Sequence, residues 1–171
     1  TRGYGRVAHG GVLRVDEHST AATVGDEALL IYRRARLPVF VGRDRRAAAR
    51  AAVAAGAQVL IADDGLQHLR LARDLEIALV DAARGFGNGA LLPAGPLREP
   101  ATRLGSVGAV VLTGAGAYQH AGALRMQLRA GQLRPLNAEG PAVPLDAFRG
   151  RRVHAFAGIG NPQRFFATLR A

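Results

Sequence analysis

The stretch VLIADDGLQHLRLARDLEIALVD, residues 59–81, decides how the chain is organised. It begins and ends with apolar runs of Val, Ile and Leu without polar alternation, which is typical of strands buried on both faces of a parallel sheet. Asp63 and Asp64 stand side by side where the first of these strands is expected to stop. Neighbouring carboxylates repel each other, so a divalent cation is the obvious partner for the pair. The alternative is a plain surface turn, since Asp-Gly is common turn chemistry.

Outward from this stretch, short apolar runs alternate with helical segments. Strands are expected at residues 37–42, 57–62, 75–81 and 107–113. The alanine-rich segment 43–56 predicts a helix with Gly56 as its C-terminal cap, and another helix should begin near Asn161 and Pro162. The sequence therefore predicts an α/β fold with a mostly parallel sheet flanked by helices.

Two segments break the alternation. Residues 82–106 contain repeated Gly and Pro and are expected to form a loop. Residues 114–150 are polar and rich in Gly and Pro, which predicts a linker with a hairpin within residues 124–136. The expected domains are therefore an α/β core over residues 1–113, a linker over 114–150, and the start of a second α/β domain over 151–171.

Composition restricts the kinds of partner. The 171 residues contain no cysteine, which excludes disulfides, thiolate metal sites and thiol nucleophiles. All 23 basic residues are arginine, and the formal net charge is +10. Arginine binds phosphate and carboxylate in bidentate fashion, which favours an anionic partner, although a compositional bias would give the same excess. The basic residues are spread along the chain and aromatic residues make up only 5%, so a nucleic-acid platform based on stacking is not favoured. No apolar run approaches the length of a membrane span, and no signal-peptide pattern opens the chain.

Several polar residues lie where chemistry is expected. Gln67 and His68 follow the aspartate pair closely and would reach the same sheet edge if the loop curls back. Asp26, in GDEALL, is expected to cap a helix, and its alternative role is to accept a proton from a substrate hydroxyl. The loop at residues 84–100 ends in Arg98 and Glu99, and its glycines would allow a ligand to approach the backbone closely.

Four segments together resemble one known family. They are RGYGR (2–6), VGDEALL (24–30), the block from IADDGLQH to GPLREPATRL (61–104), and AFAGIGNPQRFFATL (155–169). In this order, and over nearly the whole chain except residues 114–150, they look like the tetraacyldisaccharide 4'-kinases, the lipid A 4'-kinases of Gram-negative bacteria. The long central block is highly specific.

The resemblance implies a P-loop-related kinase of two α/β domains that acts at the cytoplasmic face of the inner membrane. Such a kinase uses ATP and Mg²⁺ to phosphorylate the 4'-hydroxyl of a tetraacyldisaccharide 1-phosphate lipid. By motif match, Asp26 is similar to the general base of the family. The other matched positions are Asp63, Asp64 and Glu99 for magnesium, Gln67, His68 and Arg98 for the nucleotide, and Arg2 and Tyr4 for the lipid substrate.

The chain also departs from the family pattern. Family members carry a glycine-rich phosphate-binding loop ending in Lys-Thr before RGYG, and a histidine beyond RFFATL that pairs with the base. This chain has neither, and it contains no lysine. We therefore expect an internal fragment with an incomplete P-loop-like core. The alternative is a basic, non-catalytic α/β module that binds anionic polymers or membrane surfaces, but such a module gains nothing from clustered carboxylates, which repel phosphate unless a cation intervenes.

Overall fold

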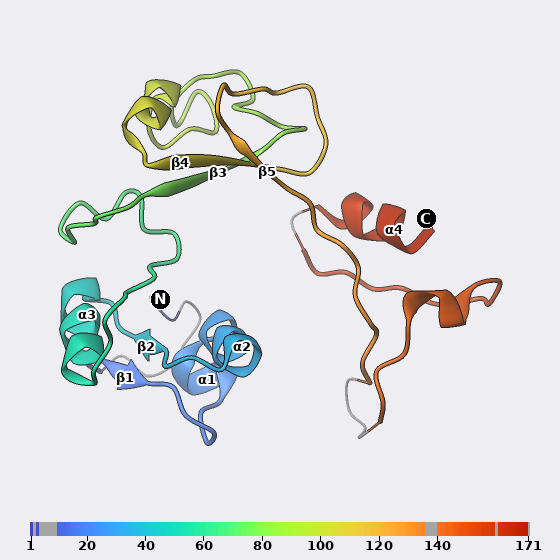
Figure 1. Ribbon diagram of the computed structural model, residues 1–171, viewed down its shortest axis with the longest axis horizontal. Helices are drawn as coiled ribbons and strands as arrows, with labels where there is room; N and C mark the ends of the chain where they lie inside the picture. The colour runs from blue at the N-terminus through green and yellow to red at the C-terminus, as the bar shows by residue number, and fades with distance from the viewer. Residues whose placement is uncertain (2, 4–9, 136–139, 160, 171) are drawn as a thin grey trace. The chain divides into compact units, whose positions relative to one another are not determined.

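The computed structural model describes every residue except 2, 4–9, 136–139, 160 and 171 (Figure 1). The chain divides into two compact units, Thr1–Ala78 and Leu79–Ala171, and each is described separately. Among the described residues, no helix is both long enough and apolar enough to cross a membrane.

A central strand organises the first unit. β2 (Phe40–Val41) pairs on one side with β1 (Leu13–Arg14) in antiparallel fashion, with Leu13 opposite Val41. On its other side the backbone of Thr1 donates to the carbonyl of Phe40 at 3.3 Å and accepts from the amide of Gly42 at 3.2 Å. This exchange with residues 40 and 42 is the pattern of a parallel pair. The strand expected at residues 37–42 is therefore confirmed, with one parallel and one antiparallel neighbour.

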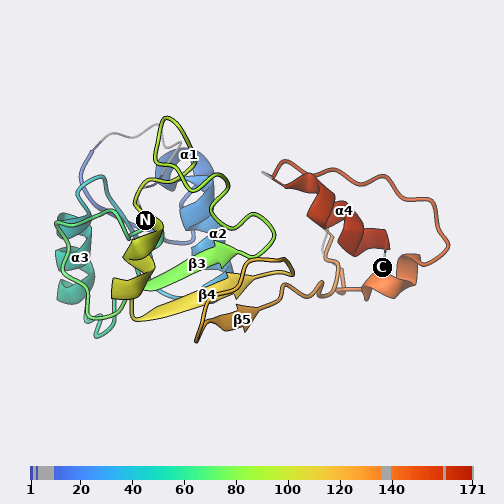
Figure 2. The same ribbon diagram turned by 90° about the horizontal axis from the view of Figure 1, so that it is seen from above.

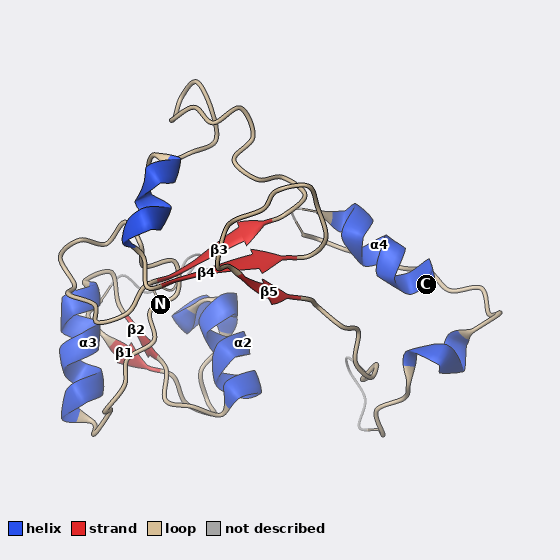
Figure 3. Ribbon diagram, turned by 45° about the horizontal axis from the view of Figure 1, so that its top comes forward, coloured by secondary structure: helices blue, strands red, loops and turns tan. Residues whose placement is uncertain are grey.

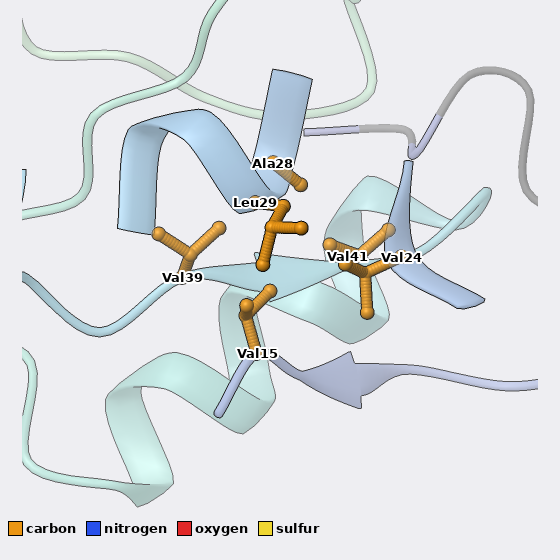
Figure 4. Packing of buried hydrophobic residues seen from close by; sticks show 6 residues of the cluster. All are labelled: Val15, Val24, Ala28, Leu29, Val39 and Val41. Atoms are coloured by element: carbon orange, nitrogen blue, oxygen red, sulfur yellow. The ribbon is translucent and has the colours of Figure 1, made fainter. Parts of the chain in front are cut away.

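Two helices cover this strand. α1 (Ala21–Val24) and α2 (Asp26–Ala35) meet at Gly25, whose φ of +90° favours glycine. Ala28 is fully buried, and its small side chain lets α2 approach the strands closely. Figure 4 shows the resulting core, in which the side chains come from both helices and both strand segments. The buried residues of this core are Val15, Val24, Ala28, Leu29, Val39 and Val41.

The third helix, α3 (Arg45–Ala54), has well-defined ends. The carboxylate of Asp44 accepts from the backbone amides of Arg46 at 2.9 Å and Ala47 at 3.1 Å, which satisfies two of the amides that a helix start leaves unpaired. At the other end Gly56 follows with φ +91°, the left-handed region in which a helix commonly stops. The helix predicted for residues 43–56 is thus confirmed.

The strand predicted at residues 57–62 is wrong for this structure. These residues have no strand assignment, and Val59, Leu60 and Ile61 are 79%, 45% and 87% exposed. An apolar run indicates a tendency to be buried, but a strand also needs a hydrogen-bonding neighbour. Residues 57–62 make no strand pairing within the part of the chain that the structure describes.

The second unit is built on a three-stranded sheet in the order β3–β4–β5. The strands are β3 (Ile77–Asp81), which begins just before the unit boundary, β4 (Ala109–Thr113) and β5 (Leu124–Met126). β4 and β5 pair in parallel with Val111 opposite Leu124, and Figure 3 shows all three arrows pointing the same way. Figure 2 shows the three strands side by side. The strands expected near 75–81 and 107–113 are confirmed.

One face of this sheet carries the core of the second unit. Its buried residues are Val80, Ala82, Val110 and Leu112. Leu104 of the 3-10 helix η1 (Ala101–Ser106) packs against them, as do Phe86 and Tyr118. The rings of these two aromatic residues pack edge to face, with 5.0 Å between the ring centroids. The loop after β3 and the loop after β4 are therefore tied to the same core.

The C-terminal part differs from expectation at one point. The hairpin expected within residues 124–136 is replaced, among the described residues, by the parallel strand β5 and an antiparallel bridge between Leu133 and Val143. A short 3-10 helix, η2 (Leu145–Phe148), follows, and then α4 (Pro162–Arg170) begins at the expected proline. The domain limits 1–113, 114–150 and 151–171 remain predictions.

The cap of α3 gives a test of this fold. Hydrogen bonds from the amides of Ala47 and Arg46 hold the pKa of Asp44 below its ordinary value of 3.8. A depressed pKa in the folded state means that the cap stabilises at neutral pH and loses its effect as the pH falls through 3.8 and below. We expect Asp44→Ala to lower the melting temperature by roughly 2–6 °C at pH 7, and Asp44→Asn to change it little. Equal melting temperatures for the wild type and Asp44→Ala would show that the cap is not formed.

Candidate active site

Four segments of the first unit meet where β2 ends. They are Thr1 beside the strand, the first turn of α2, the first residue of α3, and the turn that contains Asp63. The hydroxyl of Thr1 donates to the carboxylate of Glu27 at 3.1 Å. The charges of Arg45, Asp63 and Glu27 all lie close enough to act on the backbone nitrogen of Thr1. Opposite charges are thus gathered at the carboxyl end of a strand, where ligands bind in open α/β sheets.

Arg45 connects these segments. It is only 9% exposed and is the one charged residue that is buried among the described residues. Its Nη1 donates to the backbone carbonyl of Asp63 at 2.8 Å, which fastens the start of α3 to the acidic turn. Its Nε is buried and has no hydrogen-bond partner among the described residues. Burying a guanidinium costs free energy unless it is well paired, so this residue fixes the turn at the expense of local stability.

The acidic turn itself has both carboxylates at the surface. Asp63 and Asp64 are exposed and occupy a turn, rather than following a strand. Asp64 has φ +46°, a left-handed conformation that aspartate adopts more readily than most residues. Gly65 comes next, and a Cβ there would lie 3.3 Å from the side chain of Ala62 and 3.8 Å from Nη1 of Arg45. The DDG sequence therefore fits a tight turn that presents two carboxylates beside a buried arginine.

A second arginine fixes the rest of the loop. Nη1 of Arg73 donates to the carbonyls of His68 at 2.8 Å and Leu71 at 3.2 Å. Its guanidinium also pairs with the carboxylate of Glu76 at 2.6 Å. This loop has no helix or strand, and the hydrogen bonds from Arg73 to its carbonyl groups hold it closed. Its conformation therefore depends on Arg73.

The two polar residues after the turn lie in this same loop. The amide of His68 donates to the carbonyl of Gly65 at 2.9 Å, and its side chain is half-buried. Gln67 is exposed. The chain turns at Gly65, where the amide of His68 closes the turn, and Gln67 and His68 belong to the same unit as Asp63. Their role toward a nucleotide remains a prediction.

Asp26 differs from the prediction in one respect. The N-cap of α2 is Gly25, and Asp26 is the first residue of the helix, so Asp26 is not the cap. The reason is that Gly25, at φ +90°, ends α1 and starts α2 within a single residue. The carboxylate of Asp26 accepts from the amide of Glu27 at 2.9 Å and is otherwise exposed. An exposed carboxylate at a helix start is open to a substrate hydroxyl.

Arg98 and Glu99 belong to the second unit. Glu99 is about one quarter exposed, and its carboxylate pairs with Nε of Arg103 at 3.1 Å. The loop before it is ordered by Asn88, which donates to the carbonyl of Ala94 at 2.9 Å. A Cβ at Gly95 would lie 2.4 Å from the carbonyl oxygen of Ala90, so only glycine fits there. The loop holds Glu99 in place, but its carboxylate is already shared with an arginine.

The predicted magnesium ligands can be judged by their chemistry. Asp63 and Asp64 offer adjacent exposed carboxylates, the oxygen ligands that Mg²⁺ prefers. No group of three or more His, Asp or Glu side chains gathers closely enough for a metal ion within the described residues. Glu99 lies in the other unit, so the convergence of all three carboxylates stays a prediction. Arg2 and Tyr4, the predicted substrate residues, lie outside the described residues.

Sequence analysis missed two residues of this cluster, Arg45 and Glu27. The segment GRDRR (42–46) holds three arginines, and nothing in the pattern says which one is buried. The contact of Glu27 with Thr1 joins residues 26 apart in the sequence, which no local pattern indicates.

The link between Arg45 and the acidic turn is testable. Arg45→Leu removes the hydrogen bond that holds the turn, and it also removes the cost of burying a charge, so we expect the turn to loosen without a matching fall in the free energy of unfolding. We expect amide hydrogen exchange at His68 and Leu71, whose amides bond to carbonyls within the loop, to accelerate by roughly tenfold or more, because the turn loses its anchor. Arg46→Leu is the matched control, since Arg46 is the exposed neighbour and donates only its backbone amide to Asp44. Equal exchange rates in both variants would contradict the proposed anchoring.

Comparisons with known proteins agree with the motifs. The whole chain, residues 1–171, matches the family model for tetraacyldisaccharide-1-P 4'-kinase. It is 49% identical over 179 residues to the tetraacyldisaccharide 4'-kinase of Pseudomonas aeruginosa, covering 100% of this chain and 52% of that protein. The corresponding protein of Thiobacillus denitrificans is 51% identical over 178 residues, covering 100% of this chain and 54% of the relative.

The chain spans about half the length of the curated relatives that it matches. No solved structure matches it. A family model that covers every residue, together with relatives of this similarity, is sufficient for assignment: the chain belongs to the tetraacyldisaccharide-1-P 4'-kinase family.

Proposed function

We propose that this chain forms part of an enzyme that transfers the γ-phosphate of ATP to the 4'-hydroxyl of a tetraacyldisaccharide 1-phosphate. The observation that carries the proposal is the match of all 171 residues to the kinase family. The cluster at the end of β2 supports it, because exposed carboxylates beside a buried arginine suit a site for a metal-bound phosphate. The family pattern implies that this core is P-loop-related and lies at the cytoplasmic face of the inner membrane.

In this proposal Asp26 is the general base. Its carboxylate accepts the proton of the 4'-hydroxyl while that oxygen forms a bond to the γ-phosphorus. The bond between this phosphorus and the bridging oxygen of ADP breaks, and the electron pair leaves with ADP. The position of Asp26 at the start of α2 keeps the carboxylate exposed, and the backbone amide of Glu27 orients it. Positioning and charge stabilisation supply most of the catalysis in such transfers.

Asp63, Asp64 and Glu99 are the residues that would hold Mg²⁺. When bound, the ion neutralises charge on the phosphate oxygens. The backbone bond from Arg45 keeps Asp63 in place without using its carboxylate, which stays available as a ligand. Glu99 would have to share or exchange its contact with Arg103. The remaining proposed contacts are Gln67, His68 and Arg98 for the nucleotide, and Arg2 and Tyr4 for the lipid.

The alternative to a kinase is a non-catalytic module that binds anionic polymers. A basic module that only binds anionic polymers would use the net charge of +10 and would not depend on Asp26, Asp63 or Asp64. Substitution of these carboxylates separates the two functions, because it abolishes catalysis but leaves or strengthens binding to a polyanion.

The base can be tested in a chimera in which this chain replaces the matching half of the Pseudomonas aeruginosa relative. Asp26→Asn should preserve the fold, because asparagine can accept the same hydrogen bond from Glu27. It removes the proton acceptor, so we expect turnover of the lipid disaccharide to fall by about 10²–10⁴. The measurement is transfer of labelled phosphate from ATP.

Glu27→Gln is the matched control for that experiment. It alters the neighbouring carboxylate in the same turn of α2. That carboxylate accepts a hydrogen bond from the hydroxyl of Thr1. We expect its turnover to stay within about tenfold of the unsubstituted chimera, which is below the range for loss of a general base. Near-normal turnover of Asp26→Asn would reduce Asp26 to a structural residue.

The chain on its own gives a further prediction. It contains no lysine, and the lysine and backbone amides of a phosphate-binding loop supply much of the phosphate stabilisation in P-loop enzymes. We expect the purified 171-residue chain neither to bind Mg–ATP tightly nor to phosphorylate the lipid disaccharide. Isothermal titration followed by a transfer assay checks this. Micromolar binding or measurable transfer would show that the nucleotide site lies elsewhere in the chain.

A further inference from the structure

The loop after β4 lies directly against the start of the loop at residues 82–100. The amide of Ala82 donates to the carbonyl of Thr113 at 3.0 Å, and the amide of Tyr118 donates to the carbonyl of Ala82 at 3.1 Å. A Cβ at Gly116 would overlap that carbonyl of Ala82, so the two backbones touch there with no side chain between them. The chain after β4 therefore fixes the first residues of the loop after β3.

The ring of Tyr118 continues this support. It packs edge to face on the ring of Phe86, with 5.0 Å between the ring centroids. It also lies against Gly85, where an added Cβ would be 3.4 Å from Cδ2 of the tyrosine. Both rings pack on the buried core of the second unit. Since an edge-to-face pair has a preferred mutual orientation, the contact sets the direction of the 82–100 loop as well as its position.

The support then crosses to the returning half of the 82–100 loop. Gly87 follows Phe86 and packs on Pro96, since an added Cβ would be 3.0 Å from Cγ of the proline. The side chain of Asn88 donates to the carbonyl of Ala94 at 2.9 Å, which is a second link between the same two parts of the loop. Movement of Phe86 would therefore shift the residues around Pro96.

Backbone hydrogen bonds carry the support on to Glu99. The carbonyl of Leu97 accepts from the amide of Leu92 at 2.9 Å, and the amide of Leu97 donates to the carbonyl of Ala90 at 3.2 Å. Glu99 comes two residues after Leu97 in the chain. A continuous series of contacts thus leads from the ring of Tyr118 to Glu99.

We propose that Tyr118 is a positioning residue of the proposed kinase reaction. Acting through Phe86, it holds Glu99 for its role as a ligand of the metal ion that accompanies the nucleotide. The inference rests on the proposed function, in which Glu99 has that role. Arg103 pairs with the carboxylate of Glu99 at 3.1 Å and restrains the side chain, while the series from Tyr118 restrains the backbone before it. Tyr118 lies in the segment 114–150, outside the motifs that resemble the family, so no motif indicates this role.

Amide hydrogen exchange on the 171-residue chain tests the series of contacts. Tyr118→Leu removes the ring, so we expect exchange at Leu92 and Leu97, whose amides bond within the loop, to accelerate by about tenfold. Tyr118→Phe keeps the ring and should exchange like the wild type. Val107→Ala is the matched control, because Val107 packs on the same core from just before β4. Equal acceleration in Tyr118→Leu and Val107→Ala would overturn the proposal, since loss of core packing alone predicts it.

Binding of Mn²⁺ in the presence of ATP gives a readout other than catalysis in the chimera. The concentration of free Mn²⁺ is followed by electron paramagnetic resonance. Substitution of residues that orient metal ligands weakens metal binding by about 10–100-fold, and we expect about tenfold for Tyr118→Leu. Tyr118→Phe and Val107→Ala should leave the Mn²⁺ affinity unchanged. Glu99→Gln gives the loss that follows when the ligand itself is removed.

These variants separate failure of the positioning role from failure of the proposed function. A weaker Mn²⁺ affinity in Glu99→Gln, with an unchanged affinity in Tyr118→Leu, would overturn the positioning role alone. An unchanged affinity in Glu99→Gln would overturn the metal role of Glu99 in the proposed function, and the positioning role with it. Weaker binding in both variants, with rescue by Tyr118→Phe, is the result that the proposal predicts.

Discussion

A single buried guanidinium holds the candidate site together. Arg45 leaves the first turn of α3, lies almost wholly out of water, and donates to the backbone of the acidic turn 18 residues later in the chain. No strand forms at residues 57–65 among the described residues, so this bond and the bond from Arg73 to the carbonyl of Gly65 help to hold the acidic turn. The bond uses the carbonyl of Asp63 and not its carboxylate, and Asp63 is exposed. The burial of Arg45 is therefore tied to the conformation of the acidic turn.

Local pattern predicted the elements that depend on nearby residues. α3 lies where its alanine content, its cap at Asp44 and the glycine at 56 require it, and β3 and β4 lie where apolar runs predict them. The failure at residues 57–62 has a physical reason. A parallel strand is stabilised by neighbours that are distant in sequence, so its apolar residues indicate where burial is favourable but cannot supply the pairing. The parallel pairing of β5 with β4 was missed for the same reason, since only β4 was recognised.

The candidate site was predictable to a similar extent. The acidic pair, Gln67 and His68 were found from their position after an apolar run, and the structure places them in one loop. Arg45 could not be distinguished from its neighbours, because burial of one arginine among three depends on how the helix packs. Asp26 was expected to cap α2, but Gly25 takes that position by adopting a backbone conformation that the sequence alone does not specify. The role proposed for each residue comes from motif resemblance and not from periodicity.

The central proposal is that Asp63 and Asp64 hold one metal ion with the nucleotide, together with Glu99, as the family resemblance implies. The most direct measurement replaces Mg²⁺ by Mn²⁺ in the chimera and follows paramagnetic broadening of backbone amide signals after addition of ATP. The claim predicts that the amides of Asp64, His68 and Glu99 broaden together and saturate at one Mn²⁺ per protein. Broadening at Asp64 and His68 with a sharp signal from Glu99 would contradict the claim.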